Sequence, residues 1–400
     1  MLIGICVGSA SAGFLQSLDW VTNYRENHLW LIALLPVAGL LIGFLYHYLG
    51  KEIEPGNNLL IDTIHNPKEI IPFRMAPFVY IGTMATHLFG GSAGREGTAL
   101  QMAGAIADQF SKPFRLSGSE RKILIIAAIA AGFGSVFGTP LAGAIFGLEV
   151  FVIGRLKYDA IFPAFASAII ADLVTKLWHT AHTHYSIGII PGISFQNIIY
   201  AIIAGIVFGL CAATFTKAIH FATSLFKKKI KFPPFRSFLG GVLVALAVWA
   251  IGTTKYIGLG IPTIVASFDQ QLPAYDFALK MAFTILTLAA GFKGGEVTPL
   301  FFIGAVSGNA LSYIIHLPTG LLAGMGFVAV FAGATNTPMA CIMMAMELFG
   351  SECGAYVAIA CVVAYLLSGH NSIYGKQKIG EAKHSRFVNY EGKRVNELKK

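Results

Sequence analysis

The sequence predicts an all-α polytopic membrane protein that is built from two similar halves and contains broken helices. Three observations support this fold class. First, 55% of the 400 residues are hydrophobic and only 12% are charged, and this is about half the charged fraction of a typical soluble protein. Second, the mean hydropathy is +0.67, and apolar stretches of helical length recur from Met1 to Leu367. Third, two motifs of the first half reappear in the second half.

Apolar segments that are expected to be helices follow one another along the chain. They fall near residues 1–20, 29–49, 73–89, 96–110, 121–138, 140–154, 158–178, 196–226, 235–252, 273–292, 298–315, 319–334, 337–349 and 353–368. The first is expected to be a membrane helix and not a signal peptide, because no basic region precedes it. Several are too short to cross a hydrocarbon core of about 30 Å. Broken helices are tolerated at that depth where they are buried or line a polar cavity, as in transporters.

Two motifs indicate an internal duplication. Residues 94–105 align with residues 294–305 at an offset of 200, and residues 139–149 align with residues 337–347 at an offset of 198. The identical pairs are Gly94/Gly294, Glu96/Glu296, Thr98/Thr298, Leu100/Leu300, Gly104/Gly304, Ala105/Ala305, Thr139/Thr337, Pro140/Pro338 and Glu149/Glu347. The segments alone leave parallel and inverted repeats open.

The duplication predicts the domain organisation. We expect a first membrane repeat over residues 1–178, an external linker over 179–195 and a second membrane repeat over 196–368. Residues 369–400 are expected to form a pore-lining turn and a basic cytoplasmic tail.

Three glycine-rich turns that precede apolar helices predict an anion site. They are Gly56-Asn57-Asn58, residues 90–97 and residues 294–299. The first N–H groups of a helix have no partner within the helix, and the helix dipole is positive there. Converging helix N-termini therefore bind an anion without a full positive charge, and glycine lets the backbone approach the ion. We expect this site at the interface between the halves.

Glu96 is the candidate for proton coupling. We expect it in the second turn of its helix, inside an apolar protein, where an ionisable side chain is a functional candidate by default. Its carboxylate could take the place of an anion at a helix N-terminus and leave when it is protonated. A salt bridge with Arg95 is the structural alternative. Glu149 and Glu347 stand at helix ends, where pairing with Arg155, Lys157 or loop groups favours a structural role.

The motifs resemble those of the CLC superfamily of chloride channels and anion/proton antiporters, over essentially the whole chain. Residues 94–97 are similar to the family motif G-[KR]-E-G-P, whose Glu is the external gate, with Thr98 in place of Pro. Residues 295–299 are similar to the motif G-x-F-x-P, with Val297 at the Phe position, and Tyr374 resembles the pore-lining tyrosine. The resemblance implies a CLC-like fold, which favours an inverted repeat, and a homodimer in which each subunit holds its own path.

The departures from the chloride-handling motifs resemble the fluoride/proton antiporter branch. Asn57 stands where chloride-handling members have the Ser that contacts the central anion, and Thr98 follows the gating Glu. The second half reads G-G-E-V-T-P, and Val150 stands where proton-transporting chloride members carry an internal Glu. The resemblance therefore implies a secondary active transporter, not an enzyme, that exports fluoride in exchange for protons. It implies no cofactor.

The resemblance also assigns roles to individual residues. Gating and proton coupling are expected from Glu96 and from Glu296, although an ion pair with Lys293 would remove Glu296 from a proton route. The expected anion-binding residues are Asn57, Gly94, Arg95, Gly97, Val297, Thr298 and Tyr374. Fluoride is small and strongly hydrated, so its site must replace water with close hydrogen-bond donors, and the Asn57 side chain offers such N–H groups.

The charges and the tail predict a multi-pass protein of the bacterial plasma membrane. The 29 Lys and Arg exceed the 20 Asp and Glu by nine. The basic residues gather at 227–231 and 376–400, which the positive-inside rule assigns to the cytoplasm. Residues 369–400 leave no room for the pair of regulatory domains of many eukaryotic relatives, so a compact bacterial-type exporter is expected. The sequence has no basic face with interleaved aromatic residues, which argues against nucleic-acid binding.

Other functions remain open alternatives. The nearest is a chloride channel or chloride/proton exchanger of the same fold, and the presence of Glu96 favours exchange. Residues 90–94 spell G-x-S-x-G around Ser92, with His87 nearby, but the hydrolase motif requires a strand, a sharp elbow and a helix. His179, His182 and His184 suggest a metal transporter. We expect no metal site, because these histidines lie in the linker without carboxylates and the five Cys are scattered.

Overall fold

The computed structural model describes residues 1–67 and 69–398, which are predominantly helical. The α-helices are α1 (Leu2–Asn27), α2 (Leu35–Leu49), α3 (Asn57–His65), α4 (Met75–Leu88), α5 (Glu96–Asp108), α6 (Gly118–Phe137), α7 (Pro140–Glu149), α8 (Ile161–Leu177), α9 (Phe195–Lys229), α10 (Pro233–Ile251), α11 (Ile261–Ala266), α12 (Asp276–Ala289), α13 (Val297–Leu311), α14 (Thr319–Thr335), α15 (Pro338–Phe349) and α16 (Gly354–Leu367). Short 3-10 helices cover Leu29–Leu34, Lys51–Ile53, Gln109–Ser111, Tyr158–Ala160, Ser351–Cys353, Ser385–Tyr390 and Val395–Glu397. The strands β1 (Val152–Ile153) and β2 (Lys378–Ile379) pair in parallel.

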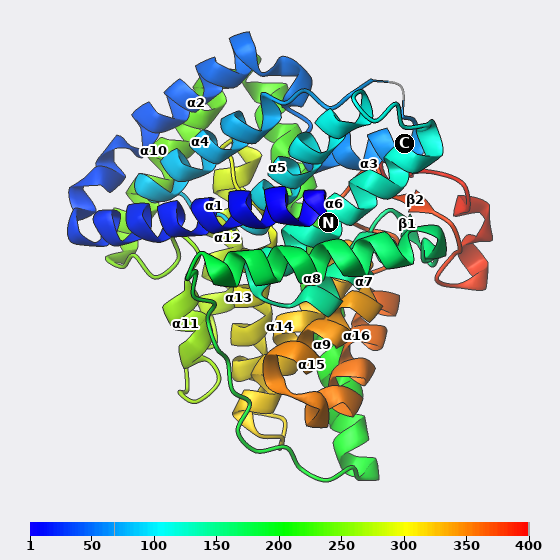
Figure 1. Cartoon of the computed structure of the whole chain (residues 1–400). Coiled ribbons are helices and arrows are strands. Elements are labelled where there is room, and N and C mark those ends of the chain that lie inside the picture. The colour runs from blue at the N-terminus through cyan, green and yellow to red at the C-terminus, as the bar shows by residue number, and fades with distance from the viewer. Residues whose placement is uncertain (68, 399–400) are drawn as a thin grey trace.

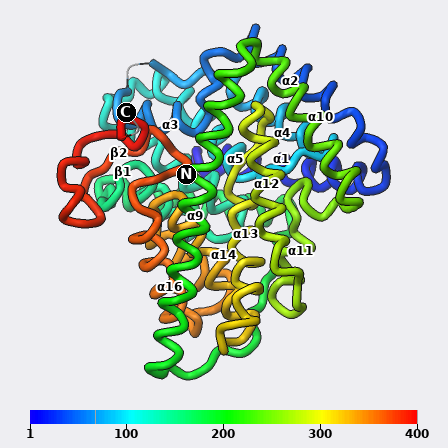
Figure 2. Tube along the Cα trace, turned by 180° about the vertical axis from the view of Figure 1, so that it is seen from behind, coloured from blue at the N-terminus to red at the C-terminus, as the bar shows by residue number. Residues whose placement is uncertain are grey.

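The helices form one body that is broad at the end of α2 and α3 and narrows toward the end where α9 begins (Figure 1). α1 and α8 pack side by side across the middle. α9 rises from the narrow end to the top of the molecule (Figure 2). Within the described residues, five helical stretches are long and apolar enough to cross a membrane, and five shorter apolar ones have 10–17 residues. This mixture confirms a membrane fold with broken helices.

The helix boundaries follow the apolar segments closely, with three differences. α3 and α11 have no apolar segment of their own, because nine and six residues are too few for a clear helical period. α1 continues to Asn27, past the end expected near residue 20. The β1–β2 pair is a small departure from an all-α fold, and it fastens the C-terminal segment to the first repeat.

The two repeats meet in opposite directions. Gly94 and Gly295 form an antiparallel bridge in which each N–H group donates to the carbonyl oxygen of the other residue, at 2.6 and 2.7 Å. α5 and α13 follow these glycines directly. Because antiparallel segments leave their bridge in opposite directions, α5 and α13 start from this contact in opposite directions, as they would in the inverted duplication that the sequence predicts.

Glu149 and Glu347 join the repeats through helix ends. The Glu149 carboxylate accepts two backbone N–H groups at the start of α15, at 2.9 and 3.1 Å. The Glu347 carboxylate accepts two at the start of α7, at 2.7 and 3.0 Å. The expected pairing with Arg155 or Lys157 is wrong, because these carboxylates bind backbone N–H groups that have no partner within their own helix. Arg155 Nε lies 3.5 Å from Glu381 Oε1 instead. Both carboxylates nevertheless have a structural role, because each caps the start of a helix of the other repeat.

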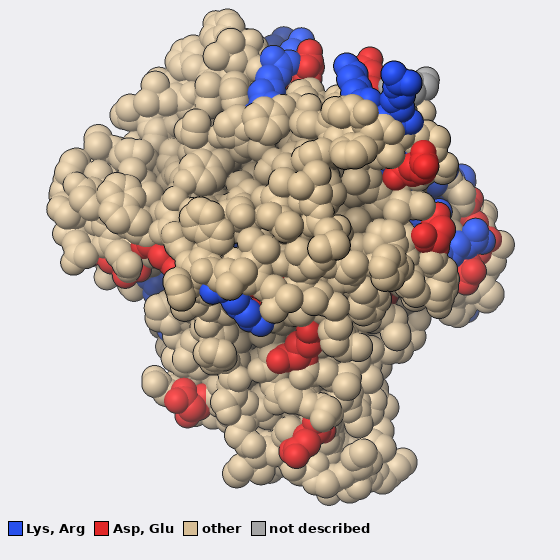
Figure 3. Space-filling model, viewed as in Figure 1, with Lys and Arg blue, Asp and Glu red and all other residues tan. Residues whose placement is uncertain are grey.

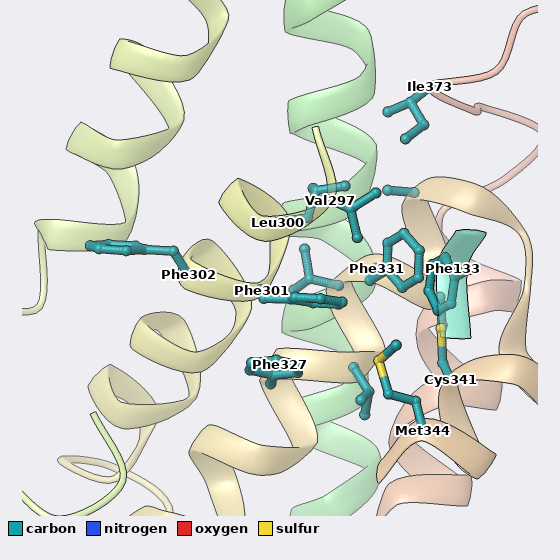
Figure 4. Close-up of a cluster of buried hydrophobic side chains, with 14 of the residues drawn as sticks. Phe133, Val297, Leu300, Phe301, Phe302, Phe327, Phe331, Cys341, Met344 and Ile373 are labelled. Carbon is teal, nitrogen blue, oxygen red and sulfur yellow. The ribbon is translucent and has the colours of Figure 1, made fainter. Parts of the chain in front are cut away.

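Stacked phenylalanine rings hold α13 in place. Phe301 of α13 stacks on Phe327 of α14 with ring centroids 4.1 Å apart, and Phe133 of α6 stacks on Phe331 at 6.0 Å. Figure 4 shows this cluster together with Val297, the first residue of α13. All five side chains are at most 1% exposed. The close packing fixes the position and direction of α13, and hence of its N-terminus.

The linker packs against the membrane helices. Residues 180–194 have no regular secondary structure and run from α8 to the narrow end (Figure 1). Tyr185 packs its ring against three phenylalanines of the second repeat. His179 and His184 are exposed, as interpreted from the sequence, but His182 is partly buried. Among the described residues, no three metal-ligating side chains come together.

Basic residues gather at the broad end of the molecule. Figure 3 shows Lys and Arg, with acidic side chains between them, along the upper edge, and only acidic side chains among the charged ones at the lower end of this face. The Lys-rich end of α9 lies at the top in Figure 2, with the C-terminal segment in the same upper half. This separation agrees with the distribution that the positive-inside rule predicts. Of the basic tail, Lys399 and Lys400 lie outside the described residues.

Candidate functional site: converging helix N-termini

Three helix N-termini and one turn converge where the repeats meet. α3 begins at Asn57, α5 at Glu96 and α13 at Val297, and the turn after α16 brings in Tyr374. A cavity of about 140 Å³ lies between these segments. The structure therefore brings together residues that the sequence motifs single out in four separate segments of the chain.

The carboxylate of Glu96, a residue of α5, lies at the N-terminus of α13. Its side chain is 0% exposed. The Thr298 N–H group donates to Glu96 Oε2 at 3.0 Å, and the Thr298 hydroxyl donates to the two carboxylate oxygens at 2.6 and 2.7 Å. The expected position in the second turn of its own helix is wrong, because Glu96 is the first residue of α5. A carboxylate from one repeat thus occupies the helix N-terminus of the other, where an anion would be favoured.

Arg95 lies beside the same carboxylate. Arg95 Nε is 3.5 Å from Glu96 Oε1, and the Arg95 backbone N–H donates to Glu96 Oε2 at 3.2 Å. The ion pair that the sequence left as an alternative therefore exists, but the bonds from Thr298 are shorter. The Arg95 side chain is 10% exposed, against 0% for the Glu96 side chain. We conclude that Arg95 adds positive charge to the site without replacing the helix N-terminus as the main partner.

Two residues that line the 140 Å³ cavity each have a polar atom without a partner among the described residues. Asn57 Oδ1 and the Tyr374 hydroxyl are both buried, and neither forms a hydrogen bond within the described residues. Both residues line the 140 Å³ cavity. Buried polar atoms almost always have a partner, which can be a water or an ion. The cavity therefore suits a small polar species, to which the Tyr374 O–H can donate and from which Asn57 Oδ1 can accept.

Gly97 packs closely against Asn57 and Gly295. A Cβ atom on Gly97 would lie 3.0 Å from Asn57 Nδ2 and 3.0 Å from the Gly295 Cα. Such contacts are tighter than almost all real ones, so a side chain here would push Asn57 away. The absence of a side chain at Gly97 therefore lets the start of α5 lie close to Asn57 and Gly295.

Glu296 lines the cavity and is partly buried. Its Oε2 lies 3.8 Å from the position that a Cβ atom on Gly97 would take. No ion pair joins it to Lys293 within the described part of the chain, and the Lys293 ammonium instead stands 3.8 Å from the ring centroid of Tyr46. The alternative that Lys293 holds the Glu296 carboxylate is therefore not seen.

The remaining motif residues lie around this arrangement. Val297 begins α13 with a fully buried side chain, and Gly94 contributes the backbone bridge to Gly295. The motif analysis did not single out Gln101, which is 9% exposed and also lines the cavity. Its spacing of four residues after Gly97 on α5 is the signal that could have found it, because residues four apart share a helix face.

The G-x-S-x-G sequence has no hydrolase geometry. The Ser92 hydroxyl lies 2.9 Å from the Thr284 hydroxyl, and the Ser92 N–H donates to the hydroxyl of Thr287 at 3.1 Å. No hydrogen bond joins Ser92 to His87 within the described residues. The segment follows α4 and precedes α5, so that the strand and elbow of the motif are lacking here.

The chain is similar to known proteins over nearly its whole length. Residues 38–369 match the family model for voltage-gated chloride channels. The chain is 55% identical to a chloride/fluoride channel protein of Pseudomonas syringae pv. tomato, over 96% of this chain and 86% of that one. It is 24% identical to an H⁺/Cl⁻ exchange transporter of Cronobacter sakazakii, over 92% and 85% of the two chains.

Two solved structures have the same fold. One is a CLC-type fluoride/proton antiporter, with a TM-score of 0.92 and 35% identity over 94% of this chain and 96% of that one. The other is a slow cyanobacterial Cl⁻/H⁺ antiporter, with a TM-score of 0.80 and 19% identity over 92% of each chain.

Proposed function

This chain belongs to the voltage-gated chloride channel family, whose members are membrane ion transporters and not enzymes, and we propose that it is a fluoride/proton antiporter. It exports fluoride from the cell in exchange for protons. The observation that carries the proposal is the Glu96 carboxylate, which is bound by the N–H and hydroxyl groups of Thr298 at the N-terminus of α13.

Exchange follows from the chemistry of this position. The charged carboxylate and an anion compete for the same donors, so they do not occupy the site together. When a proton from outside binds Glu96, the neutral acid loses its attraction to the helix dipole and the side chain leaves. An anion from the 140 Å³ cavity then takes its place, and return of the carboxylate after release of the proton displaces the anion.

Glu296 is the proposed partner of Glu96 in proton transfer. It lines the cavity close to Gly97, and Val150 stands where proton-transporting chloride members carry an internal Glu. Because no ion pair within the described residues holds its carboxylate, Glu296 is free to accept a proton and release it again.

We propose that the hydrogen-bond donors around the cavity make the site selective for fluoride. The side-chain N–H groups of Asn57 and the hydroxyl of Tyr374 can replace water around a small anion. Relatives with 55% and 35% identity whose descriptions mention fluoride support this assignment. A chloride channel or a chloride/proton exchanger is the second candidate, supported by the more distant Cl⁻-transporting relatives.

The assembly and the cellular location are also proposals. We infer a homodimer with one path in each subunit, in the bacterial plasma membrane, with the C-terminal tail in the cytoplasm. Chemical crosslinking of dilute protein in lipid vesicles tests the assembly, and a band that stays at the size of one chain would contradict the dimer.

Reconstitution into liposomes tests the function. Vesicles loaded with fluoride or with chloride are diluted into a medium free of that ion, and release is followed with an ion-selective electrode while the external pH is recorded. We expect fluoride release with proton uptake and little release of chloride. Rapid chloride release without proton movement would instead identify a chloride channel, and the roles of Asn57 and Glu296 would be withdrawn. Chloride release coupled to proton uptake would identify a chloride/proton exchanger.

A further inference from the structure

A second, basic cavity adjoins the cavity of the proposed anion site. It has a volume of about 230 Å³ and lies between the end of α2, the start of α10 and the segment that joins α12 to α13. Its lining includes four basic side chains, Lys51, Lys231, Arg236 and Lys293, and one carboxylate, Glu54. We call this cavity the basic side chamber.

Tyr46, Glu54 and Lys293 line both the basic side chamber and the 140 Å³ cavity, so these residues form the wall between the two spaces. The 140 Å³ cavity contains Asn57 and Tyr374. A movement of the Lys293 side chain would therefore join the chamber to the proposed anion site.

The position of the Lys293 side chain is set by close packing. A Cβ atom on Gly82 of α4 would lie 2.9 Å from both Cβ and Cγ of Lys293, so the lack of a side chain at Gly82 makes room for the Lys293 stem. The ammonium group stands 3.8 Å from the ring centroid of Tyr46. This is a cation–π contact, which holds the charge in the wall without neutralising it.

The basic groups of the chamber are not paired with carboxylates. Within the described residues, no salt bridge includes Lys51, Lys231, Arg236 or Lys293. Among the described residues, the Arg236 side chain donates to the backbone carbonyl oxygens of residues 230 and 231, at 2.8 and 3.2 Å, and to no carboxylate. The chamber thus carries an excess of positive charge in a walled space, where low-dielectric surroundings focus the field.

From these observations we propose that the basic side chamber is a lateral route by which anions reach the transport site from the Lys-rich side of the protein. Lys293 is the positioning residue of this route, because its ammonium group attracts an anion past Tyr46 into the cavity that contains Asn57. The inference rests on the proposed anion transport, but not on the choice between fluoride and chloride.

Lys293→Met tests this role, because it keeps much of the packing volume and removes the charge. The initial rate is measured against anion concentration on the Lys-rich side of oriented vesicles, for whichever halide is transported. We expect KM to rise about threefold to tenfold with little change in the maximal rate, since the charge acts on capture. In the unchanged protein we expect KM to rise with ionic strength, because salt screens the charge of Lys293. In Lys293→Met we expect a smaller rise.

Two further variants separate charge from folding. Lys293→Arg keeps the charge and is expected to restore KM, whereas Lys228→Met removes an exposed charge outside the chamber and is expected to leave KM unchanged. An unchanged KM in Lys293→Met, or equal increases in Lys293→Met and Lys293→Arg, would overturn the proposal. Protein that transports neither halide before any substitution would overturn the proposed function instead.

Discussion

At the scale of single residues, the site depends on a competition for hydrogen-bond donors. The Glu96 carboxylate is fully buried, and its shortest bonds come from Thr298 and not from Arg95. A buried carboxylate is stable only where charges and donors replace its water. An anion that enters this position must therefore be matched by loss of the negative charge of Glu96, which is the physical reason to expect proton coupling.

Glu96→Gln tests this coupling directly. The amide cannot release a proton and carries no charge, so we expect proton uptake linked to fluoride release to fall to background, while the anion site stays open to anions. The measurement records pH and fluoride together in liposomes, with the exposed residue Glu352→Gln as a control. Proton movement that stays tied to fluoride in Glu96→Gln would contradict the assignment.

Asn57→Ser tests selectivity. The substitution removes the N–H donors and leaves a hydroxyl, so we expect the ratio of fluoride to chloride release rates to fall about tenfold, which corresponds to roughly one net hydrogen bond. The same substitution at Asn66, exposed at the other end of α3, serves as the matched control. Equal ratios in Asn57→Ser and the unchanged protein would remove Asn57 from the selectivity mechanism.

At this scale, sequence motifs located residues better than they located contacts. Glu96, Asn57 and Tyr374 could be singled out from glycine-rich turns and from the CLC resemblance, and the structure brings them to one place. The partner of Glu96 could not be predicted, because Thr298 is 202 residues away along the chain. Gln101 and the contact between Lys293 and Tyr46 were missed for the same reason.

At the scale of elements, helix ends are held by side chains from the other repeat. Glu149 is 7% exposed and binds two N–H groups at the start of α15. Glu149→Ala is expected to lower the free energy of unfolding by about 2 kcal/mol, because it leaves two helix N–H groups without an acceptor. Thermal unfolding in detergent measures this change. A loss no larger than that of Glu352→Ala, which alters an exposed carboxylate, would show that the cap contributes little.

The C-terminal segment is fastened to the end of α16. The Lys383 ammonium donates to the carbonyl oxygens of Tyr365 and Gly369, each at 2.6 Å, and to the hydroxyl of Ser368 at 3.1 Å. His370 Nε2 accepts the backbone N–H of Lys383 at 3.2 Å. The lysine satisfies free carbonyl groups at a helix C-terminus, where positive charge is favourable.

This fastening is expected to depend on pH through His370. Burial, together with the nearby Lys383, lowers the pKa of His370 below its usual value. The folded state then binds fewer protons than the unfolded state. The contribution of His370 to the stability of the folded segment is therefore complete above a pH of about 6.5, and it is lost as the pH falls through the lowered pKa. We expect limited proteolysis to cut the C-terminal segment faster as the pH falls from about 7.5 to about 5.

His370→Gln is expected to remove this pH dependence, because the amide oxygen of Gln can take the place of Nε2 and accept the same N–H group without titrating. His179→Gln, which changes an exposed histidine in the linker, is the control. A cleavage rate that rises with acid equally in both variants would contradict the role of His370.

At the scale of the whole molecule, the charges define two ends. The Lys-rich end of α9 and the C-terminal segment lie in the broad half, and the linker reaches the narrow end (Figures 1 and 2). The positive-inside rule predicts that the broad end faces the cytoplasm. We expect a cysteine placed by Lys228→Cys to react with a membrane-impermeant reagent in inverted vesicles and not in intact cells, and a cysteine placed by His184→Cys to do the opposite. Labelling of both from the same side would contradict the orientation.

The sequence by itself determined that this protein lies in a membrane, and it determined the order of its helices. Composition and apolar periodicity are local properties, so they predicted a helical membrane protein, the short helices and the repeated motifs that flank the site. Three-dimensional packing alone decided which repeat satisfies which helix end, that Glu96 binds Thr298, and that Lys293 stands in the wall between two cavities. These pairings join residues far apart along the chain, and a free N–H group or a buried charge accepts any suitable partner that the fold brings near.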